Sequence, residues 1–296
     1  MIRCQTAMIT IAGRPNVGKS TLTNALVGEK VSIVSNKPQT TRNRICGIVN
    51  RGDYQLIFAD TPGFHKSRNR LDKYMSETVL ESVSDVDAVF LLVEPIPNIG
   101  PQEESLIASL RENGIPAVLI INKIDSVLPE AILPVIDLYR KAYDFDDIIP
   151  ISAKKGDGIE LIIEAAKNYA SEGPMLFPDD ITSDQPEKQI CAELIREKLL
   201  WCLDKEVPHG TAVEITRFTE RDNGIVDVDA VIYCEKASHK GIIIGKQGAM
   251  LKKISTLARQ DFEKYMGTQV YMTTWVKVKE NWRDSSGMLR NFGYSE

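Results

Sequence analysis

The chain has 296 residues, a formal net charge of −5 and 43% hydrophobic residues, which is typical of a globular protein long enough for two domains. No apolar run approaches the roughly 18 residues of a membrane-spanning helix, and we expect no signal peptide before the first strand-like run. Five scattered cysteines without a C-x-x-C pair argue against zinc and disulfides and favour a reducing cytoplasm.

Charge is distributed unevenly along the chain. Residues 1–180 carry 19 basic and 24 acidic side chains, whereas residues 181–296 carry 17 of each. Within the second part, residues 236–283 hold 10 basic and 3 acidic side chains, a net charge of +7. Such a basic segment in an acidic protein suggests a polyanionic partner, and a solvated surface is the alternative.

In the first part of the chain, apolar runs alternate with helical patterns, which predicts an α/β fold with a doubly wound, mostly parallel sheet. The expected strands span residues 8–12, 45–50, 54–59, 88–93, 117–121 and 148–151. The expected helices span residues 20–27, 71–82, 102–112, 130–142 and 159–169.

Between residues 171 and 186 the composition changes to Ser, Glu, Gly, Pro and Asp, which is typical of a linker. We therefore predict three parts, a first domain, a linker and a second domain, at residues 1–172, 173–185 and 186–296. The second domain is expected to be a smaller α+β fold. Its expected elements are helices at 187–203 and 248–265 and strands at 211–219, 225–234 and 269–278.

The stretch Gly13–Ser20 fits the phosphate-binding pattern G-x-x-x-x-G-K-[ST] and lies between a strand-like and a helix-like run, as that pattern requires. Backbone N–H groups of such a loop, aided by the helix N-terminus, can bind phosphate oxygens. Lys19 would reach the β- and γ-phosphates, and the Ser20 hydroxyl would ligate Mg²⁺. A glycine-rich turn without a ligand is the alternative. The expected nucleotide contacts here are Gly13, Asn16, Val17, Gly18, Lys19, Ser20 and Thr21.

The segment Asn122–Asp125 follows an apolar strand and would determine which nucleotide base the site accepts. A carboxylate at Asp125 can accept hydrogen bonds from guanine N1–H and N2–H₂, whereas adenine has no such donor pair and would leave the carboxylate unpaired. Asn122 would tie this loop to the base or to the phosphate loop, and the Lys123 stem would cover the base. After the last strand, Ser152–Lys154 would place the Ala153 N–H near guanine O6.

Two further segments are expected to respond to the γ-phosphate. Asp60 follows a strand and would hold Mg²⁺ through water, and the Gly63 N–H can approach the γ-phosphate because glycine has no side chain. One of the adjacent threonines in residues 37–42 should ligate Mg²⁺, and we favour Thr41 over Thr40. These loops would be ordered by Mg²⁺ and the γ-phosphate and released after hydrolysis.

Over about residues 5–170 these motifs resemble the translation-factor-related GTPases. The resemblance implies that GTP and GDP are the ligands, with Lys19, Thr41, Gly63 and Asn16 serving catalysis. Phe64 stands where a Ras-like GTPase has a water-orienting glutamine, so the catalytic residue is elsewhere or absent. In GTPases with an asparagine like Asn16, a bound K⁺ replaces an arginine finger, so K⁺ is a candidate cofactor; a turn residue is the alternative.

In the second domain, Gly245–Gly248 forms a G-x-x-G loop inside the basic segment. The helix–strand–strand–helix–strand order around it resembles a KH domain of the bacterial type II, in which a helix precedes the sheet. Such loops clamp single-stranded nucleic acid because glycines allow close backbone approach; a glycine-rich helix start is the alternative. The expected RNA contacts are Ile244, Gly245, Lys246, Gln247, Gly248, Lys252, Lys253, Lys277 and Lys279.

Two tryptophans close the second domain. We expect Trp275 to be core rather than a stacking platform, and we leave both roles open for Trp282 because it lies past the last strand. Lys277 and Lys279 alternate on that strand and therefore share one face, toward phosphates or water.

From end to end the chain resembles the Era-like GTPases, in which a P-loop GTPase domain precedes a KH domain. The segments Pro38–Arg42, Ile195–Lys198 and Trp275–Lys279 share in this resemblance. It implies a GTP-hydrolysing switch that binds the 3′ end of small-subunit ribosomal RNA, assists small-subunit biogenesis, and is cytoplasmic with partial association with the inner membrane face. We expect a monomer. Alternatives are an RNA scaffold with negligible hydrolysis and a membrane-signalling GTPase.

Overall fold

The computed structural model describes residues 4–63, 69–84 and 86–294, so Phe64 lies outside the described residues. The chain forms two compact units. The N-terminal unit comprises residues 1–32, 41–67 and 75–184, and the C-terminal unit comprises residues 33–40, 68–74 and 185–296. Two short segments of the first half of the chain thus belong to the C-terminal unit.

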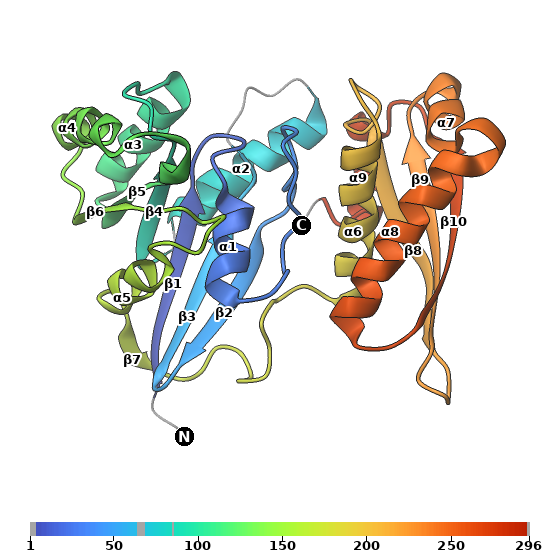
Figure 1. Ribbon diagram of the computed structural model, residues 1–296, viewed down its shortest axis with the longest axis horizontal. Helices are drawn as coiled ribbons and strands as arrows, with labels where there is room; N and C mark the ends of the chain where they lie inside the picture. Colours follow the sequence, from blue (N-terminus) through green and yellow to red (C-terminus); the bar gives the residue numbers. More distant parts are fainter. Residues whose placement is uncertain (1–3, 64–68, 85, 295–296) are drawn as a thin grey trace. The chain divides into compact units, whose positions relative to one another are not determined.

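A predominantly parallel sheet organises the N-terminal unit, with strand order β2-β3-β1-β4-β5-β6 (Figure 1). Only β2 among these six runs antiparallel to its neighbour, β3. The strands are β1 Cys4–Ala12, β2 Ile45–Arg51, β3 Tyr54–Asp60, β4 Ala88–Val93, β5 Ala117–Ile121 and β6 Asp147–Pro150. The predicted doubly wound fold is confirmed, and each predicted strand is present to within a few residues.

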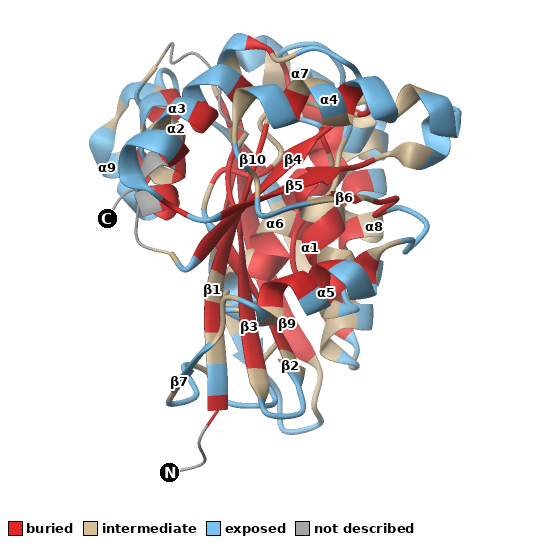
Figure 2. Cartoon of the chain, turned by 90° about the vertical axis from the view of Figure 1, so that its left-hand side faces the viewer, coloured by how far each residue is buried: buried red, intermediate tan, exposed pale blue. Residues whose placement is uncertain are grey.

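Helices cover both faces of this sheet because its strand residues alternate between two apolar clusters. On one face, Leu22 of α1 and Ile162 of α5 pack on Phe58 and Phe90. On the other face, helices α2, α3 and α4 pack on Leu91 and its neighbours. Figure 2 shows the resulting burial of the central strands. The helices are α1 Lys19–Val27, α2 Arg70–Ser84, α3 Pro101–Asn113, α4 Leu133–Ala142 and α5 Ile159–Lys167, with short turns η1 Ile124–Ser126 and η2 Pro129–Ala131.

The segment predicted as a linker is structured. Strand β7 (Ser171–Gly173) pairs antiparallel with the start of β1, and Ile181 packs against residues of β2 and β3. The Gln55 side chain accepts hydrogen bonds from the backbone N–H groups of Leu176 (2.8 Å) and Phe177 (2.9 Å). Residues predicted as a linker thus contact the N-terminal unit through side-chain pairing of the kind Gln55 provides, which local composition does not reveal. The three-part division of the chain itself stays a prediction.

In the C-terminal unit a three-stranded sheet, β10-β9-β8, carries two long helices on one face. Strand β9 is antiparallel to β8 and parallel to β10. Leu199 of α6 and Phe262 of α8 pack on Ile232 of β9, and Ile33 joins the same cluster. The elements are α6 Glu187–Cys202, β8 Thr211–Glu220, β9 Val226–Cys234, α7 Ala237–Ile244, η3 Lys246–Gly248, α8 Ala249–Met266, β10 Val270–Val278, η4 Trp282–Asp284 and α9 Ser286–Asn291.

For this unit the sequence analysis missed one helix and placed one side chain wrongly. Residues Ala237–Ile244 form a helix, α7, that the sequence did not predict, and only Ile243 of its three isoleucines is buried. Trp275 is not a core residue, because it lies on the outer face of β10 and is 46% exposed. Trp282, for which two roles were open, is fully buried and donates its Nε1–H to the Gly210 carbonyl (3.0 Å).

Candidate functional site

The phosphate loop joins β1 to α1, as the sequence predicts. Gly18 caps α1 with a positive φ of 104°, and a Cβ there would collide with the side-chain amide of Asn122. Glycine is therefore required both by the backbone conformation and by the close approach of a second loop. The N-terminus of α1 opens onto this loop, so its unpaired N–H groups are available to an anion.

Lys19 is the buried cation of this loop. It is 6% exposed, and its Nζ donates to the carbonyls of Gly13 (3.1 Å) and Arg14 (3.0 Å). Burial lowers the pKa of Lys19 to about 8, and the nearby Asp60 carboxylate opposes that shift. Phosphate oxygens would supply the negative charge that a buried ammonium lacks here.

The residues predicted to ligate Mg²⁺ meet beside Lys19. Ser20 Oγ lies 2.9 Å from Thr41 Oγ1, and the Asp60 Oδ2 atom accepts a hydrogen bond from Thr41 Oγ1 (3.4 Å). Asp60 is fully buried, and its Oδ1 atom has no hydrogen-bond partner. Burial also raises the pKa of Asp60. An unpartnered buried carboxylate oxygen beside two hydroxyls fits the all-oxygen coordination of Mg²⁺.

Of the two adjacent threonines, Thr41 points into this cluster. Thr40 Oγ1 instead donates to the Lys37 carbonyl (2.7 Å) within its own turn. The geometry thus favours Thr41 as the ligand. A residue that the sequence did not single out, Ser32, also reaches the cluster, because its Oγ donates to Asp60 Oδ2 (2.8 Å). No local motif marks Ser32, since its partner is 28 residues away.

The base-recognition loop is tied to the phosphate loop, as expected for Asn122. Its Nδ2 donates to the Val17 carbonyl (2.8 Å), and its Oδ1 accepts from the Ala153 N–H (3.0 Å). The Ala153 N–H thus has a side-chain acceptor in this structure, and its contact with guanine O6 stays a prediction. Lys123 Nζ donates to the Asn16 carbonyl (2.6 Å) and forms an ion pair with Glu94. The sequence analysis did not single out Glu94.

Asp125 faces the solvent at the end of this loop. The Ser152 Oγ donates to Asp125 Oδ1 (2.7 Å), and this hydrogen bond lowers the pKa of the carboxyl group. The Asp125 side chain is exposed, so a base that binds there would cover it. Asn16 is also exposed and has a positive φ of 66°, which fits a turn residue and leaves its K⁺ role a prediction.

The G-x-x-G loop lies between α7 and α8. Gly245 ends α7 with φ 72°, and a Cβ there would approach the Met250 Cβ to 2.7 Å. Gly248, also at positive φ, caps α8, so the helix N-terminus opens onto the loop. Lys246 and Gln247 at its tip are exposed, and Ile244 is half-buried.

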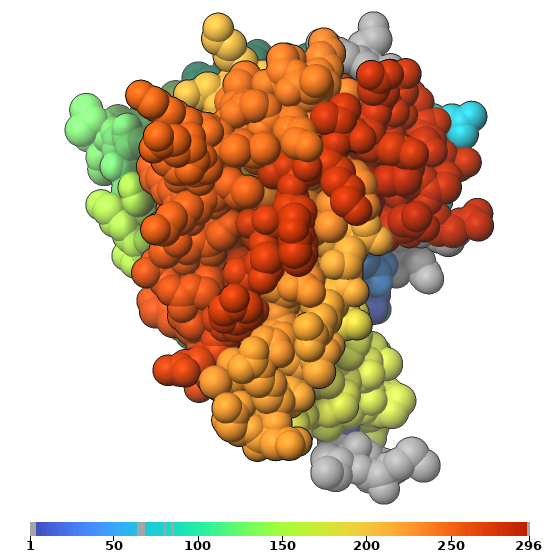
Figure 3. Space-filling view, turned by 90° about the vertical axis from the view of Figure 1, so that its right-hand side faces the viewer, coloured from blue at the N-terminus to red at the C-terminus, as the bar shows by residue number. Residues whose placement is uncertain are grey.

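Further basic side chains accompany this loop. Lys252 and Lys253 are exposed on the first turns of α8. Because Ser255 Oγ of α8 contacts Thr274 Oγ1 of β10 (2.7 Å), the first half of the helix lies beside the second half of the strand. That half of β10 carries exposed Trp275 and Lys277, and Lys279 follows it. Figure 3 shows the red-orange β10 at the surface beside the orange α8.

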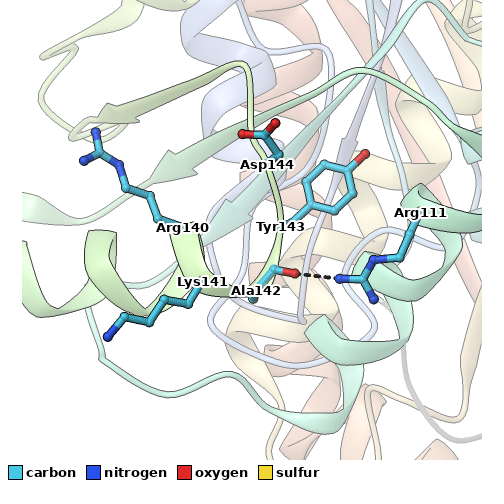
Figure 4. Close-up of a pocket in the computed structure, with 6 residues that line it drawn as sticks. All are labelled: Arg111, Arg140, Lys141, Ala142, Tyr143 and Asp144. Atoms are coloured by element: carbon cyan, nitrogen blue, oxygen red, sulfur yellow. Dashed lines mark hydrogen bonds between the residues drawn. The ribbon is translucent and has the colours of Figure 1, made fainter.

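A surface hollow elsewhere in the N-terminal unit carries no predicted site residue. Side chains from the ends of α3 and α4 surround it, and Arg111 Nη2 donates to the Ala142 carbonyl there (2.7 Å; Figure 4). Its lining residues are Arg111, Arg140, Lys141, Ala142, Tyr143 and Asp144. Among the helices within the described ranges 4–63, 69–84 and 86–294, none has the length and apolar character to cross a membrane.

Family models and curated relatives agree with both sites. The model for the 50S ribosome-binding GTPase family matches residues 8–123, and the KH domain model matches residues 206–283. GTPase Era of Ruminiclostridium cellulolyticum is 50% identical over 98% of this chain and 97% of its own. GTPase Era of Caldanaerobacter subterraneus is 49% identical over 97% of each chain.

Solved structures agree over nearly the full length. A structure of Era in complex with MgGDPNP and nucleotides 1506–1542 of 16S ribosomal RNA has a TM-score of 0.94 and 36% identity, covering 99% of this chain and 100% of that one. A variant of Aquifex aeolicus Era bound to GDP and AlF₄⁻ also has a TM-score of 0.94, with 35% identity and the same coverage.

Proposed function

The chain belongs to the Era GTPase family and is a GTPase, and from this premise we propose that it is a GTP-driven switch that binds the 3′ end of small-subunit ribosomal RNA and assists small-subunit biogenesis. One observation carries the proposal. A buried phosphate site with an unpartnered Asp60 oxygen and an exposed basic G-x-x-G loop occur in one chain. The 36% identical Era structure holds MgGDPNP and 16S ribosomal RNA together, which supports the same pair of ligands here.

The residues have distinct roles in this proposal. Lys19 and the loop N–H groups bind the β- and γ-phosphates, and Asp125 pairs with guanine N1–H and N2–H₂. Ser20, Thr41 and Asp60 would hold Mg²⁺, which when bound stabilises negative charge on the transferred phosphoryl group. The Gly63 N–H would meet the γ-phosphate. Asn16 is the candidate ligand of a K⁺ that stabilises charge at the β,γ-bridge.

The test is RNA affinity as a function of the nucleotide. A fragment carrying the 3′-terminal sequence of the small-subunit RNA, and a shuffled fragment of equal length, are titrated against protein loaded with a non-hydrolysable GTP analogue or with GDP. We expect tighter binding of the native fragment in one nucleotide state. Equal affinities in both states would exclude the switch, because a ligand shifts only an equilibrium whose states it binds unequally.

Turnover separates this proposal from the RNA scaffold with structural nucleotide. Multiple-turnover hydrolysis is measured in K⁺ and in Na⁺, with and without the RNA fragment. We expect slow turnover that K⁺ accelerates, because Phe64 stands in the sequence where a Ras-like GTPase has its water-orienting glutamine. Absence of turnover in all four conditions would favour the scaffold. A cytoplasmic location with peripheral membrane association, and a monomeric state, remain predictions that fractionation and light scattering can test.

A further inference from the structure

Two carboxylates behind the nucleotide site hold the cations of its two recognition loops. Glu94 directly follows β4, and Glu103 lies in the first turn of α3, so both come from outside the motifs. Glu103 pairs with Arg14 Nε of the phosphate loop, and Glu94 Oε1 pairs with Lys123 Nζ of the base-recognition loop. Glu94 Oε2 also lies 3.8 Å from Arg14 Nη2, so the four side chains form one connected cluster.

The cluster is partly withdrawn from water. The Glu103 side chain is fully buried, and those of Glu94 and Arg14 are 29% and 26% exposed. The second Glu103 oxygen accepts the Gly100 N–H (3.1 Å), which fixes the carboxylate to the start of α3. A buried, doubly held carboxylate has little freedom to move, so its pairing fixes the Arg14 side chain more firmly than an exposed ion pair could.

Both cations of the cluster, Arg14 and Lys123, are also linked to the phosphate loop by hydrogen bonds. The carbonyl of Arg14 accepts a hydrogen bond from Lys19 Nζ (3.0 Å), so holding Arg14 helps to hold the phosphate-binding lysine. Lys123 Nζ donates to the Asn16 carbonyl (2.6 Å), two residues further along the same loop. Two chains of contacts therefore end in the phosphate loop. One runs from Glu103 through Arg14 to Lys19, and the other runs from Glu94 through Lys123 to Asn16.

We propose that Glu94 and Glu103 are positioning residues that join the phosphate loop and the guanine-recognition loop into one rigid receptor and thereby slow nucleotide release. Neither carboxylate contacts the nucleotide in this assignment. Glu94 aligns Lys123 over the base, and Glu103 keeps Arg14 turned away from the phosphates. The inference rests on the nucleotide site proposed above, whose own test is guanine-selective binding by the unmodified protein.

The experiment measures the dissociation rate constant of a fluorescent GDP from full-length protein. Glu94→Gln and Glu103→Gln each keep the side-chain size and remove the charge, and Glu104→Gln is the matched control because Glu104 is the exposed neighbour on the same helix. We expect release to accelerate roughly tenfold in Glu94→Gln, which loses a charge-assisted hydrogen bond to Lys123, and several-fold in Glu103→Gln, which loses an ion pair with Arg14. Release from Glu104→Gln should stay at the parent rate.

A double-mutant cycle distinguishes positioning from general destabilisation. Lys123→Met removes the partner of Glu94, so adding Glu94→Gln to that variant should change the release rate by less than about twofold. Unchanged release in both single variants, or a full Glu94→Gln effect in the Lys123→Met background, would overturn the proposal. Because Glu94 is partly exposed, we expect Glu94→Gln to fold. The test can therefore be carried out even if Glu103→Gln does not fold. If the parent protein shows no guanine preference, the nucleotide site itself fails instead.

Discussion

The phosphate loop and the G-x-x-G loop both place glycines before a helix N-terminus, but the rest of the molecule holds them very differently. Lys19 is buried and bonded to two carbonyls, and the loop around it is tied to Asn122 and Lys123. Lys246 and Gln247 are exposed, and backbone hydrogen bonds hold their loop. The first loop is therefore a preorganised receptor, whereas the second is a platform whose cations remain in water.

This difference predicts different energetics. In the buried site Lys19 and Asp60 are desolvated before the ligand arrives, so removing one of these groups leaves its partner uncompensated and costs a large share of the binding free energy. In the exposed site the attraction to phosphates is shared among several lysines and is screened by salt. Single substitutions should thus have large effects at the first loop and smaller, salt-dependent effects at the second.

Lys19→Ala should have the largest effect. It removes the buried ammonium that bonds to both Gly13 and Arg14, at a cost of about 2–5 kcal/mol in nucleotide affinity, which is about 30-fold or more. Isothermal titration with GDP and Mg²⁺ measures it, with Lys141→Ala on α4 as an exposed control. Nucleotide affinity equal to that of the parent protein would contradict the assignment of the phosphate loop.

Asp125→Asn should come next and change selectivity rather than phosphate binding. The variant keeps one acceptor oxygen but loses the second charge-assisted hydrogen bond from guanine, which is worth about 1.5–3 kcal/mol, so GDP affinity should fall by roughly 10- to 100-fold. The new amide can donate to the C2 carbonyl of xanthine, so xanthosine diphosphate should bind better than it does to the parent. Competition between the two nucleotides measures this, and a retained guanine preference would rule out the bidentate contact.

Replacing Lys246 and Gln247 together by Asp tests the exposed loop. RNA affinity should fall by about tenfold or more at moderate salt, and the slope of log affinity against log salt should become shallower by roughly 0.7 for each RNA phosphate that the variant no longer neutralises. GTP hydrolysis without RNA should be unchanged, which serves as the internal control. RNA binding that survives with the same salt slope would remove the G-x-x-G loop from the interface.

How well the sequence predicted each region follows from how local its determinants are. The phosphate loop and Asn122–Asp125 are short contiguous motifs at strand ends, so their roles could be assigned and the structure brings them together. The sequence analysis did not identify Ser32, whose partner Asp60 is 28 residues away. It did not identify Glu94 either, because its partner Lys123 is 29 residues away. Spacing of this kind becomes visible only when the sheet forms.

In the C-terminal unit the errors have two different origins. Helix α7 ends in three isoleucines and contains Gly241, a composition that favours a strand, and packing against β9 and β10 overrides that preference. Trp275 could have been assigned correctly, because alternation along β10 places it with exposed Tyr271 and Lys277 and opposite buried Val276. The apolar character of tryptophan was given more weight than the period of the strand.

The two tryptophans of this unit supply the smallest predicted effect and its control. Trp275→Ala should change the free energy of unfolding by no more than about 0.5 kcal/mol, because the side chain is 46% exposed and leaves no cavity. Trp282→Ala should cost about 3–5 kcal/mol, because it empties a buried space beside Phe292 and removes the donor to the Gly210 carbonyl. Urea unfolding of both variants measures the contrast. Equal destabilisation of the two variants would mean that Trp275 is a core residue. A stable Trp275→Ala variant with weakened RNA binding would instead identify the exposed ring as a stacking surface for a base, and the loss in RNA-binding free energy should then be about 1–3 kcal/mol.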